Sequence, residues 1–337
     1  MNKLVLTLLT TSLISLLTSL AVSGLIIKLM SDQGLGQQIR SWGPTLHAHK
    51  SGTPTMGGLA ILAGIGISSF LLWLFSPEEN HYLALFLLGG FGFGLIGFSD
   101  DLLSILRGQS QGLSPAEKIG SQVVFSLGLI FLAFHLLETP NQVLLPFIGR
   151  EIFLSPPWFH TLATFVIVGT VNGVNLSDGL DGLAGGGVVI TLAGFALLGP
   201  LELLPVLAIS VAATVGFLWH NLFPADIFLG DTGSFALGGI IATAAVVTRT
   251  ELFLPLFGGL FVLDTLSVII QVPYYKITGS RVFKISPLHH HFESAEGIDY
   301  SYLLPEVEWA EPKVTGRLWI VHLILGSIGL AGYFCCF

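Results

Sequence analysis

Long stretches without a charged side chain recur from one end of this sequence to the other, and they constrain its fold more than any other feature. Each is close to the roughly 20 residues that a helix needs to cross a ~30 Å hydrocarbon layer. Only 10% of the residues are charged, against roughly 25% in an average soluble domain. The stretches are continuous and do not alternate as the strands of a membrane barrel do. We therefore expect an all-α integral membrane protein.

Ten apolar ranges are candidates for membrane-spanning helices, and residues 1–337 are expected to form one membrane-embedded domain. Glycine-rich runs such as GGFGFG at 89–94 indicate close helix packing. The first range contains AVS at 21–23, which resembles a signal-peptide cleavage site. Its apolar run continues past that site to Ile27, so an uncleaved span is expected. The ranges are 4–27, 57–75, 83–98, 123–137, 158–174, 185–198, 203–219, 235–247, 252–272 and 318–337.

Positive charges are divided unevenly between the two sets of loops that ten crossings would create. Ten of the 13 Lys and Arg residues lie in one set, and three lie in the other. The positive-inside rule makes the first set cytoplasmic and puts both termini outside. The net charge of -8 argues only against nucleic acid as a partner. The cytoplasmic set comprises 28–56, 99–122, 175–184, 220–234 and 273–317.

Polar residues that could carry chemistry collect in five stretches of these cytoplasmic loops. Each has a structural explanation when taken alone: Ser99 could cap a helix with Asp100 and Asp101 in its first turn, and NLSDGLDG could be a turn. Independent caps and turns give no reason for all five stretches to lie on one face, which favours a shared function. The stretches read HAHKSGTPTMGG (47–58), GFSDD (97–101), NGVNLSDGLDGLAGG (172–186), WHNLFPADIFLGDTGS (219–234) and SPLHHHFE (286–293).

Carboxylates stand close to the ends of the predicted spans in these stretches, as Asp100, Asp101, Asp178, Asp181 and Asp231. Ionisable groups cost about 2.5 to 3.5 kcal/mol each at a membrane helix centre and are functional candidates for that reason. Clustered carboxylates without cysteine suit Mg²⁺ or Mn²⁺, and Mg²⁺ commonly binds phosphate oxygens. Three consecutive histidines do not form the pair of a zinc helix, so donation to phosphates is favoured over a zinc site. The pattern predicts metal-assisted phosphoryl transfer at the inner membrane surface.

At these motifs the sequence resembles the phospho-N-acetylmuramoyl-pentapeptide transferases of bacterial cell-wall synthesis, in the superfamily of polyprenyl-phosphate N-acetylhexosamine-1-phosphate transferases. The motifs KSGTPTMGG, NLSDGLDGLA, FLGDTGS and PLHHHFE follow the family's order along essentially the whole chain. KSGTPTMGG and HHHFE favour this family over its siblings, which share mainly the aspartate motifs. A sibling that transfers a different sugar phosphate from UDP is one alternative, and a transporter with a midplane site is another.

The resemblance implies ten transmembrane helices, a homodimer, dependence on Mg²⁺ or Mn²⁺, and a bacterial inner membrane with the active site on its cytoplasmic face. The implied reaction transfers phospho-MurNAc-pentapeptide from UDP-MurNAc-pentapeptide to undecaprenyl phosphate, giving lipid I and UMP. This is the first membrane step of peptidoglycan synthesis. A lipid phosphate with a second pKa of about 6 is largely dianionic at pH 7. Direct attack is therefore favoured over a two-step route through a phosphosugar intermediate on an aspartate.

The resemblance also implies roles for individual residues. Asp231 would ligate the metal, with Asp100 and Asp101 close to it and to the lipid phosphate. Asp100 is the preferred chemical group, and the other aspartate would hold a cation such as Lys118. Phe228 would stack on uracil. The nucleoside and sugar pocket would also contain Lys50, Asn175, Asp178, Gly179, Leu180, Asp181 and Asn221, and the phosphate region would be lined by Thr55, Lys118, His289, His290 and His291.

Four features depart from the family's usual pattern. Ser177 stands where Thr is common and Leu229 where Met is common, so the hydroxyl and the apolar character are kept. Asp264 lies where Glu is common, which shortens the reach of the carboxylate by one methylene. The segment 294–314 is longer than usual and could change a cytoplasmic loop or a partner contact.

Overall fold

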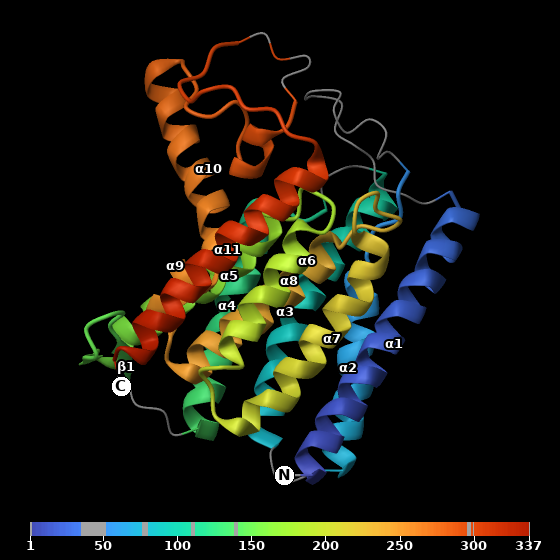
Figure 1. The fold of residues 1–337 in the computed structure, drawn as a ribbon, viewed down its shortest axis with the longest axis vertical. Coiled ribbons are helices and arrows are strands. Elements are labelled where there is room, and N and C mark those ends of the chain that lie inside the picture. The colour runs from blue at the N-terminus through green and yellow to red at the C-terminus, as the bar shows by residue number, and fades with distance from the viewer. Residues whose placement is uncertain are drawn as a thin grey trace.

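The computed structural model describes residues 2–34, 52–75, 80–108, 112–137, 141–294, 298 and 300–336, which form a helical bundle (Figure 1). Within these ranges, nine helices are long and apolar enough to cross a membrane. The all-α, polytopic fold class is therefore confirmed. The nine are α1 (Asn2–Asp32), α2 (Gly58–Phe75), α3 (Asn80–Arg107), α4 (Pro115–Leu137), α5 (Pro156–Leu176), α7 (Leu204–Asn221), α8 (Gly230–Thr248), α10 (Gly259–Thr278) and α11 (Glu311–Phe334).

Two of the ten predicted spans are not simple crossing helices. The sixth forms α6 (Leu183–Phe195), whose 13 residues span only about 20 Å. The ninth begins with the short helices η4 (Glu251–Phe253) and α9 (Leu254–Phe257) before α10 starts. The backbone N–H of Leu260, in the first turn of α10, donates to Nδ1 of His322 in α11 at 3.0 Å. The first N–H groups of a helix have no partner inside it, so His322 stabilises this interruption.

The helix that carries the GFSDD motif is longer than its apolar range. Because α3 runs on to Arg107, Ser99 and the two aspartates after it lie inside the helix. The hydroxyl of Ser99 donates to the carbonyl oxygen of Leu95, one turn earlier, at 2.8 Å. The prediction that Ser99 caps the start of a new helix is therefore wrong. The hydrogen-bonded backbone of α3 continues through this local capping signal, because extending a formed helix is easier than starting another.

Helix α8 occupies the centre of the bundle. In its most apolar stretch of 18 residues 89% of the residues are buried, against 22% in the corresponding stretch of α1. Helix α3 packs closely along it. A Cβ added at Gly97 of α3 would lie 2.1 Å from the carbonyl oxygen of Asp231, at the start of α8. Small residues allow membrane helices to approach this closely. The polar end of α3 is thereby brought against the N-terminus of α8.

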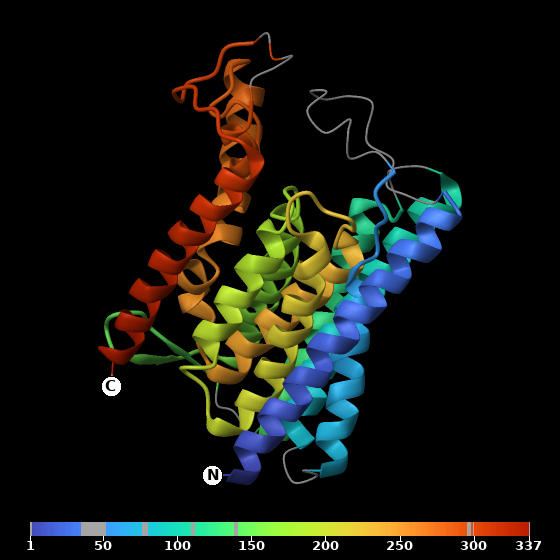
Figure 2. The ribbon, with the colours of Figure 1, turned by 45° about the vertical axis from the view of Figure 1, so that its right-hand side comes forward.

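Both chain termini lie away from the end of the bundle that carries the polar motifs. In Figure 1 the N-terminus is at the bottom, whereas α10 rises to the loops at the top. Figure 2 shows α10 and α11 leaning away from the other helices toward that upper end. Between α4 and α5 in the chain, β1 (Gln142–Leu144) and β2 (Glu151–Phe153) form an antiparallel hairpin. The short helix η3 (Leu201–Leu203) leads into α7. Which end faces the cytoplasm stays a prediction from the positive charges.

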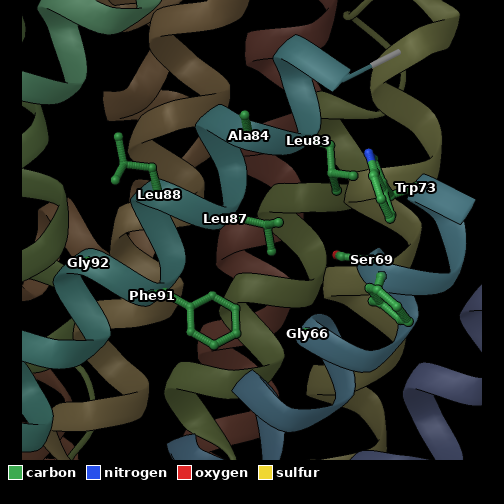
Figure 3. Close-up of a pocket in the computed structure, with 10 residues that line it drawn as sticks. Gly66, Ser69, Trp73, Leu83, Ala84, Leu87, Leu88, Phe91 and Gly92 are labelled. Carbon is green, nitrogen blue, oxygen red and sulfur yellow. The ribbon is translucent and has the colours of Figure 1, made fainter. Parts of the chain in front are cut away.

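A hollow of about 680 Å³ lies between α2 and α3 (Figure 3). Phe70, Trp73 and Phe91 line it together with leucine, alanine and glycine, and Ser69 supplies a hydroxyl. None of its lining residues is charged, so it offers no ligand for a metal or a phosphate. The chemistry predicted from the sequence therefore belongs to the other end of these helices.

Candidate active site

Asp101 connects the end of α3 to the first turn of α8. Its carboxylate accepts hydrogen bonds from the backbone N–H of Asp231 at 3.1 Å and from that of Thr232 at 2.9 Å. The Thr232 hydroxyl donates to the same carboxylate at 2.6 Å. A negative charge is stabilised at a helix N-terminus, where the N–H groups lack partners. Asp101 thus caps α8 from a neighbouring helix.

Three carboxylates meet where these two helices join. Asp100, Asp101 and Asp231 each offer one oxygen, and the three oxygens lie within 4.8 Å of one another. The first two are buried, and Asp231 is partly exposed. Carboxylate oxygens are the ligands that hard divalent cations prefer. Within the described residues, these three could hold a metal ion together.

One cation and one amide hold these carboxylates in place. The Lys118 ammonium, from α4, lies 2.9 Å from Oδ2 of Asp100 and 2.6 Å from Oδ2 of Asp231. The Asn175 amide, near the end of α5, donates to Oδ1 of Asp231 at 2.8 Å and to the Ser234 hydroxyl at 2.9 Å. The cluster therefore draws on four helices. Its negative charge is partly balanced by Lys118.

Asp100 is the aspartate that pairs with Lys118. Its other oxygen accepts the backbone N–H of Leu113 at 2.6 Å, in the segment that leads from α3 to α4. The Arg107 guanidinium donates to the carbonyl oxygen of Gly112 at 2.6 Å and holds the same segment. The sequence predicts that Asp100 carries the chemistry and that the other aspartate holds the cation. The structure instead places the cation on Asp100, because Asp101 is turned toward the start of α8.

The segment before α2 brings Thr55 to the aspartates. The N–H of Phe228 donates to the carbonyl oxygen of Pro54 at 2.8 Å, and the N–H of Gly57 donates to that of Phe228 at 2.9 Å. These bonds place residues 54–57 alongside the segment that precedes α8. A Cβ added at Gly230 would lie 3.1 Å from the Thr55 hydroxyl and close to the capping carboxylate. The predicted site residue Lys50 lies outside the described residues.

Asn221 holds together two of the predicted motif loops. Its Oδ1 accepts the N–H of Gly182 at 3.2 Å, and its Nδ2 donates to the carbonyl oxygen of Ile227 at 2.9 Å. The side chain is buried. Asn221 therefore connects the loop before α6 to the loop before α8, which is a supporting position for a residue predicted to bind substrate.

Asp181 has a similar connecting position. Its carboxylate accepts the N–H of Ala225 at 2.9 Å, while its own N–H donates to the Glu311 carboxylate at the start of α11, at 2.8 Å. Asp181 and Leu180 are buried, whereas Asp178 and Gly179 are partly exposed. Asp178 and Gly179 therefore present more surface to a ligand than the other two residues of the predicted nucleoside pocket.

The three consecutive histidines lie in η5 (Leu288–Phe292) and have different environments. Nδ1 of His289 lies 2.9 Å from the Asp264 carboxylate, and both side chains are buried. Nδ1 of His290 lies 2.5 Å from the Glu293 carboxylate, and its side chain is 21% exposed. His290 is therefore the more accessible of these two.

His291 is held by backbone groups of the loop after α10. Its Nδ1 accepts the backbone N–H of Lys284 at 3.1 Å, and its ring donates a hydrogen bond to the Pro305 carbonyl oxygen. Burial lowers the pKa of His291, and the positive charge of Lys284 lowers it further. A neutral, buried imidazole with these backbone contacts stabilises the loop after α10. Its predicted place beside the phosphates stays a prediction.

Three residues that hold the site together are not predicted from the sequence. Thr232 fixes Asp101, Glu293 fixes His290, and Glu311 fixes the backbone of Asp181. Thr232 belongs to the GDTGS motif and Glu293 to the HHHFE motif. The motifs therefore point to these residues, but they do not predict what each side chain contacts. Glu311 begins EPKV, which gave no indication of a contact with residue 181 because the two are 130 positions apart.

Comparisons with known proteins agree with this geometry. Residues 83–249 match the model of glycosyl transferase family 4, and residues 50–62 match phospho-N-acetylmuramoyl-pentapeptide-transferase signature 1. The first of these ranges contains all three aspartates of the cluster. The second contains the segment that carries Thr55.

Full-length relatives bear the name of the same family. The phospho-N-acetylmuramoyl-pentapeptide-transferase of Desulforamulus reducens is 43% identical over 324 residues, covering 95% of this chain and 93% of the relative. The relative from Desulforudis audaxviator is 40% identical over 333 residues, covering 95% of this chain and 96% of the relative. The relative from Bartonella quintana is 41% identical over 328 residues, covering 91% of this chain and 87% of the relative. With such identity across nearly its whole length, the chain belongs to the phospho-N-acetylmuramoyl-pentapeptide-transferase family.

Proposed function

We propose that this protein transfers phospho-MurNAc-pentapeptide from its UDP carrier to undecaprenyl phosphate, giving lipid I and UMP. The relatives' names support this first membrane step of peptidoglycan synthesis. The observation that carries the proposal is the group of three carboxylates at the polar end of the membrane helices. There, a water-soluble nucleotide and a lipid phosphate can reach one site.

The carboxylate group fits Mg²⁺, and Mn²⁺ is the alternative ion. All its ligand atoms are oxygens, and Asp231 is the partly exposed member that could share the ion with a substrate. Asp100 and Asp101 are the other two candidate ligands. A bound Mg²⁺ would neutralise negative charge on the diphosphate of the UDP substrate. Lys118 lies between two of these carboxylates and would add a second positive charge beside the phosphates.

The polar end of the bundle is proposed to face the cytoplasm of a bacterial cell, across its inner membrane. Ten of the 13 Lys and Arg residues belong to the loops predicted for that face. A UDP-linked substrate is a cytoplasmic molecule, so the charge pattern and the substrate agree. A homodimer is expected from the family resemblance, and the mass of the purified protein in detergent would test it.

Direct attack by the lipid phosphate is the proposed route. Both oxygens of Asp101 accept hydrogen bonds from the start of α8, and both oxygens of Asp100 are occupied by Leu113 and Lys118. Hydrogen bonds and an ion pair stabilise the charge of a carboxylate and so weaken it as a nucleophile. The two aspartates are better placed to orient charges than to form a covalent intermediate, and Asp100 with Lys118 would orient the lipid phosphate.

The nucleotide is proposed to bind beside residues 177–182 and the segment before α8. Phe228 is partly exposed there and offers an aromatic face to uracil. Asp178 and Gly179 would contact the nucleoside and sugar, with Leu180, Asp181 and Asn221 beneath them. Thr55, Asn175, His290 and Lys50 are proposed to contact the phosphates and the sugar.

Release of UMP tests the reaction. The purified protein would be given UDP-MurNAc-pentapeptide and Mg²⁺, with and without undecaprenyl phosphate. We expect UMP release only when the lipid phosphate is present, together with a lipid-linked sugar product. Release that is equal without the lipid would contradict the proposed acceptor. Release from UDP-N-acetylglucosamine in preference would instead identify a sibling enzyme.

A trapping experiment tests the route. The protein would be incubated with UDP-MurNAc-pentapeptide labelled in the sugar, with Mg²⁺ but without the lipid, and then denatured rapidly. Direct attack predicts that no label stays on the protein. Label recovered on a peptide that contains Asp100 or Asp101 would establish the two-step route instead.

A further inference from the structure

A buried aspartate of α10 holds the first histidine of η5 at two points. The backbone N–H of His289 donates to Oδ1 of Asp264 at 3.2 Å, and Nδ1 of its ring lies 2.9 Å from Oδ2. Asp264 is 1% exposed and His289 is fully buried. An ionised carboxylate can only accept hydrogen bonds, so Nδ1 carries a proton, and in the neutral imidazole Nε2 is left as an acceptor. Asp264 therefore determines the position and the tautomer of this imidazole.

The free side of the imidazole is turned toward one glycine. Nε2 of His289 has no hydrogen-bond partner among the described residues. A Cβ added at Gly179 would lie only 2.3 Å from this nitrogen and 3.1 Å from Nε2 of His290. Two imidazoles, each held at Nδ1 by a carboxylate, thus converge on Gly179. A buried polar atom without a partner is costly, and its retention indicates a role beyond packing.

We propose that Asp264 is a positioning residue for binding of the UDP-linked substrate. It fixes His289, and His289 together with His290 fixes the backbone at Gly179, between the two aspartates of the DGLD sequence. The inference rests on the proposed function, since this loop is the proposed nucleoside and sugar pocket. The carboxyl group of Asp264 acts through the imidazole and touches no substrate.

This arrangement predicts an effect on one substrate rather than on the whole reaction. The contacts run from α10 through η5 to the loop before α6, and they use none of the three clustered aspartates. Loss of the Asp264 carboxylate should therefore weaken binding of the UDP substrate. It should leave the affinity for Mg²⁺ and for the lipid phosphate unchanged. A general loss of folding would instead reduce the rate without changing any KM.

The first test compares the Asp264 carboxylate with a carboxylate outside the polar motifs. Asp264→Asn replaces one carboxylate oxygen with an N–H donor, so the contact to Nδ1 can be kept only if the ring proton moves to Nε2. The control is Glu151→Gln, since Glu151 lies in β2, 3.8 Å from Arg249 in an exposed pair. We expect Asp264→Asn to raise KM for UDP-MurNAc-pentapeptide about tenfold, with kcat and KM for the lipid within about threefold. Glu151→Gln should change each constant less than twofold.

Nitrogen NMR of the histidine rings tests the mechanism independently of activity. With ¹⁵N-labelled histidine, and with His289→Gln to identify the signal, the unmodified protein should show His289 protonated at Nδ1. In Asp264→Asn the Asn amide can donate to Nδ1, and the proton should move to Nε2. An unchanged His289 signal would overturn the positioning role, as would a KM for the UDP substrate within twofold of the unmodified protein.

A double variant distinguishes positioning from an independent effect. If Asp264 acts only through His289, then Asp264→Asn combined with His289→Gln should raise KM no more than His289→Gln alone. Multiplied effects would overturn the inference. If Asp264→Asn lowers the thermal midpoint too far to assay, two other measurements decide it. His289→Gln should raise KM for the UDP substrate about tenfold, and the unmodified protein should show His289 protonated at Nδ1; failure of either would overturn the inference. Absence of UMP release by the unmodified protein would contradict the proposed function, while the NMR result would still test the pair.

Discussion

Lys118→Met should destabilise the protein in a way that Mg²⁺ reverses. The Lys118 ammonium lies 2.6 and 2.9 Å from two carboxylates of a cluster whose oxygens are within 4.8 Å of one another. At an effective dielectric constant of 20, two carboxylates at that separation repel each other by ~3.5 kcal/mol. Methionine has a similar length and no charge, so it removes the compensating cation while leaving the repulsion.

The magnitude follows from how buried the pairs are. Removing one partner of a fully buried ion pair costs about 3 to 5 kcal/mol. The Lys118 side chain is 25% exposed, and water screens part of the interaction. We therefore expect a loss of about 2 kcal/mol in the free energy of unfolding when a chelator removes divalent ions. A bound divalent cation would replace the missing charge, so added Mg²⁺ should stabilise the variant more than the unmodified protein.

Thermal unfolding in detergent, followed by tryptophan fluorescence with EDTA and across a Mg²⁺ titration, measures both effects. The matched control is Lys276→Met, which removes an exposed cation at the end of α10. The control should unfold like the unmodified protein at every Mg²⁺ concentration. An identical Mg²⁺ response of Lys118→Met and the unmodified protein would refute the reasoning, because Lys118 would then not share its carboxylates with the metal.

Two further predictions concern the bundle and its pH dependence. Gly97→Ala should severely lower the thermal midpoint and UMP release, because the new Cβ would lie 2.1 Å from a backbone oxygen of α8. The control is Gly128→Ala, whose new Cβ would have no neighbouring atom within 4 Å, and it should change neither quantity. Equal midpoints for the two variants would contradict the close packing. Burial raises the pKa of Glu251 from 4.5 to about 8. Between these two pH values the folded protein keeps a proton that the unfolded chain releases. The free energy of unfolding therefore falls as the pH rises from 4.5 to about 8. Glu251→Gln should unfold at a higher temperature than the unmodified protein at pH 8, with the difference shrinking toward pH 5; a difference independent of pH would contradict the assignment.

The membrane helices were predictable because hydropathy is a local property of the sequence. Each predicted span overlaps a helix of the structure, but the ends differ where polar residues extend a helix. α3 continues through GFSDD, and α8 begins at Gly230 rather than at the first residue of its apolar range. Local capping rules could not show that Asp101 caps a different helix. That contact joins residues 130 positions apart.

The candidate site could be predicted as a set of motifs and not as a set of contacts. The motifs placed the aspartates and histidines near one end of the bundle. The sequence could not show that Lys118 pairs with Asp100, or that His289, His290 and His291 point in different directions. Three neighbouring residues in a tight helical turn necessarily face different surroundings. Which of them meets Asp264 depends on how α10 packs, and that is a tertiary property.

Mg²⁺-dependent UMP release by Asp231→Asn shows whether the carboxylates at the junction of α3 and α8 bind the metal used in phosphoryl transfer. Asparagine keeps an oxygen that can accept from Asn175, so the fold should be retained, and thermal unfolding checks this. We expect UMP release to fall by at least about a hundredfold, and Mn²⁺ binding, measured by electron paramagnetic resonance, to weaken. Glu151→Gln should leave both unchanged. Undiminished UMP release and Mn²⁺ binding in Asp231→Asn would contradict the account.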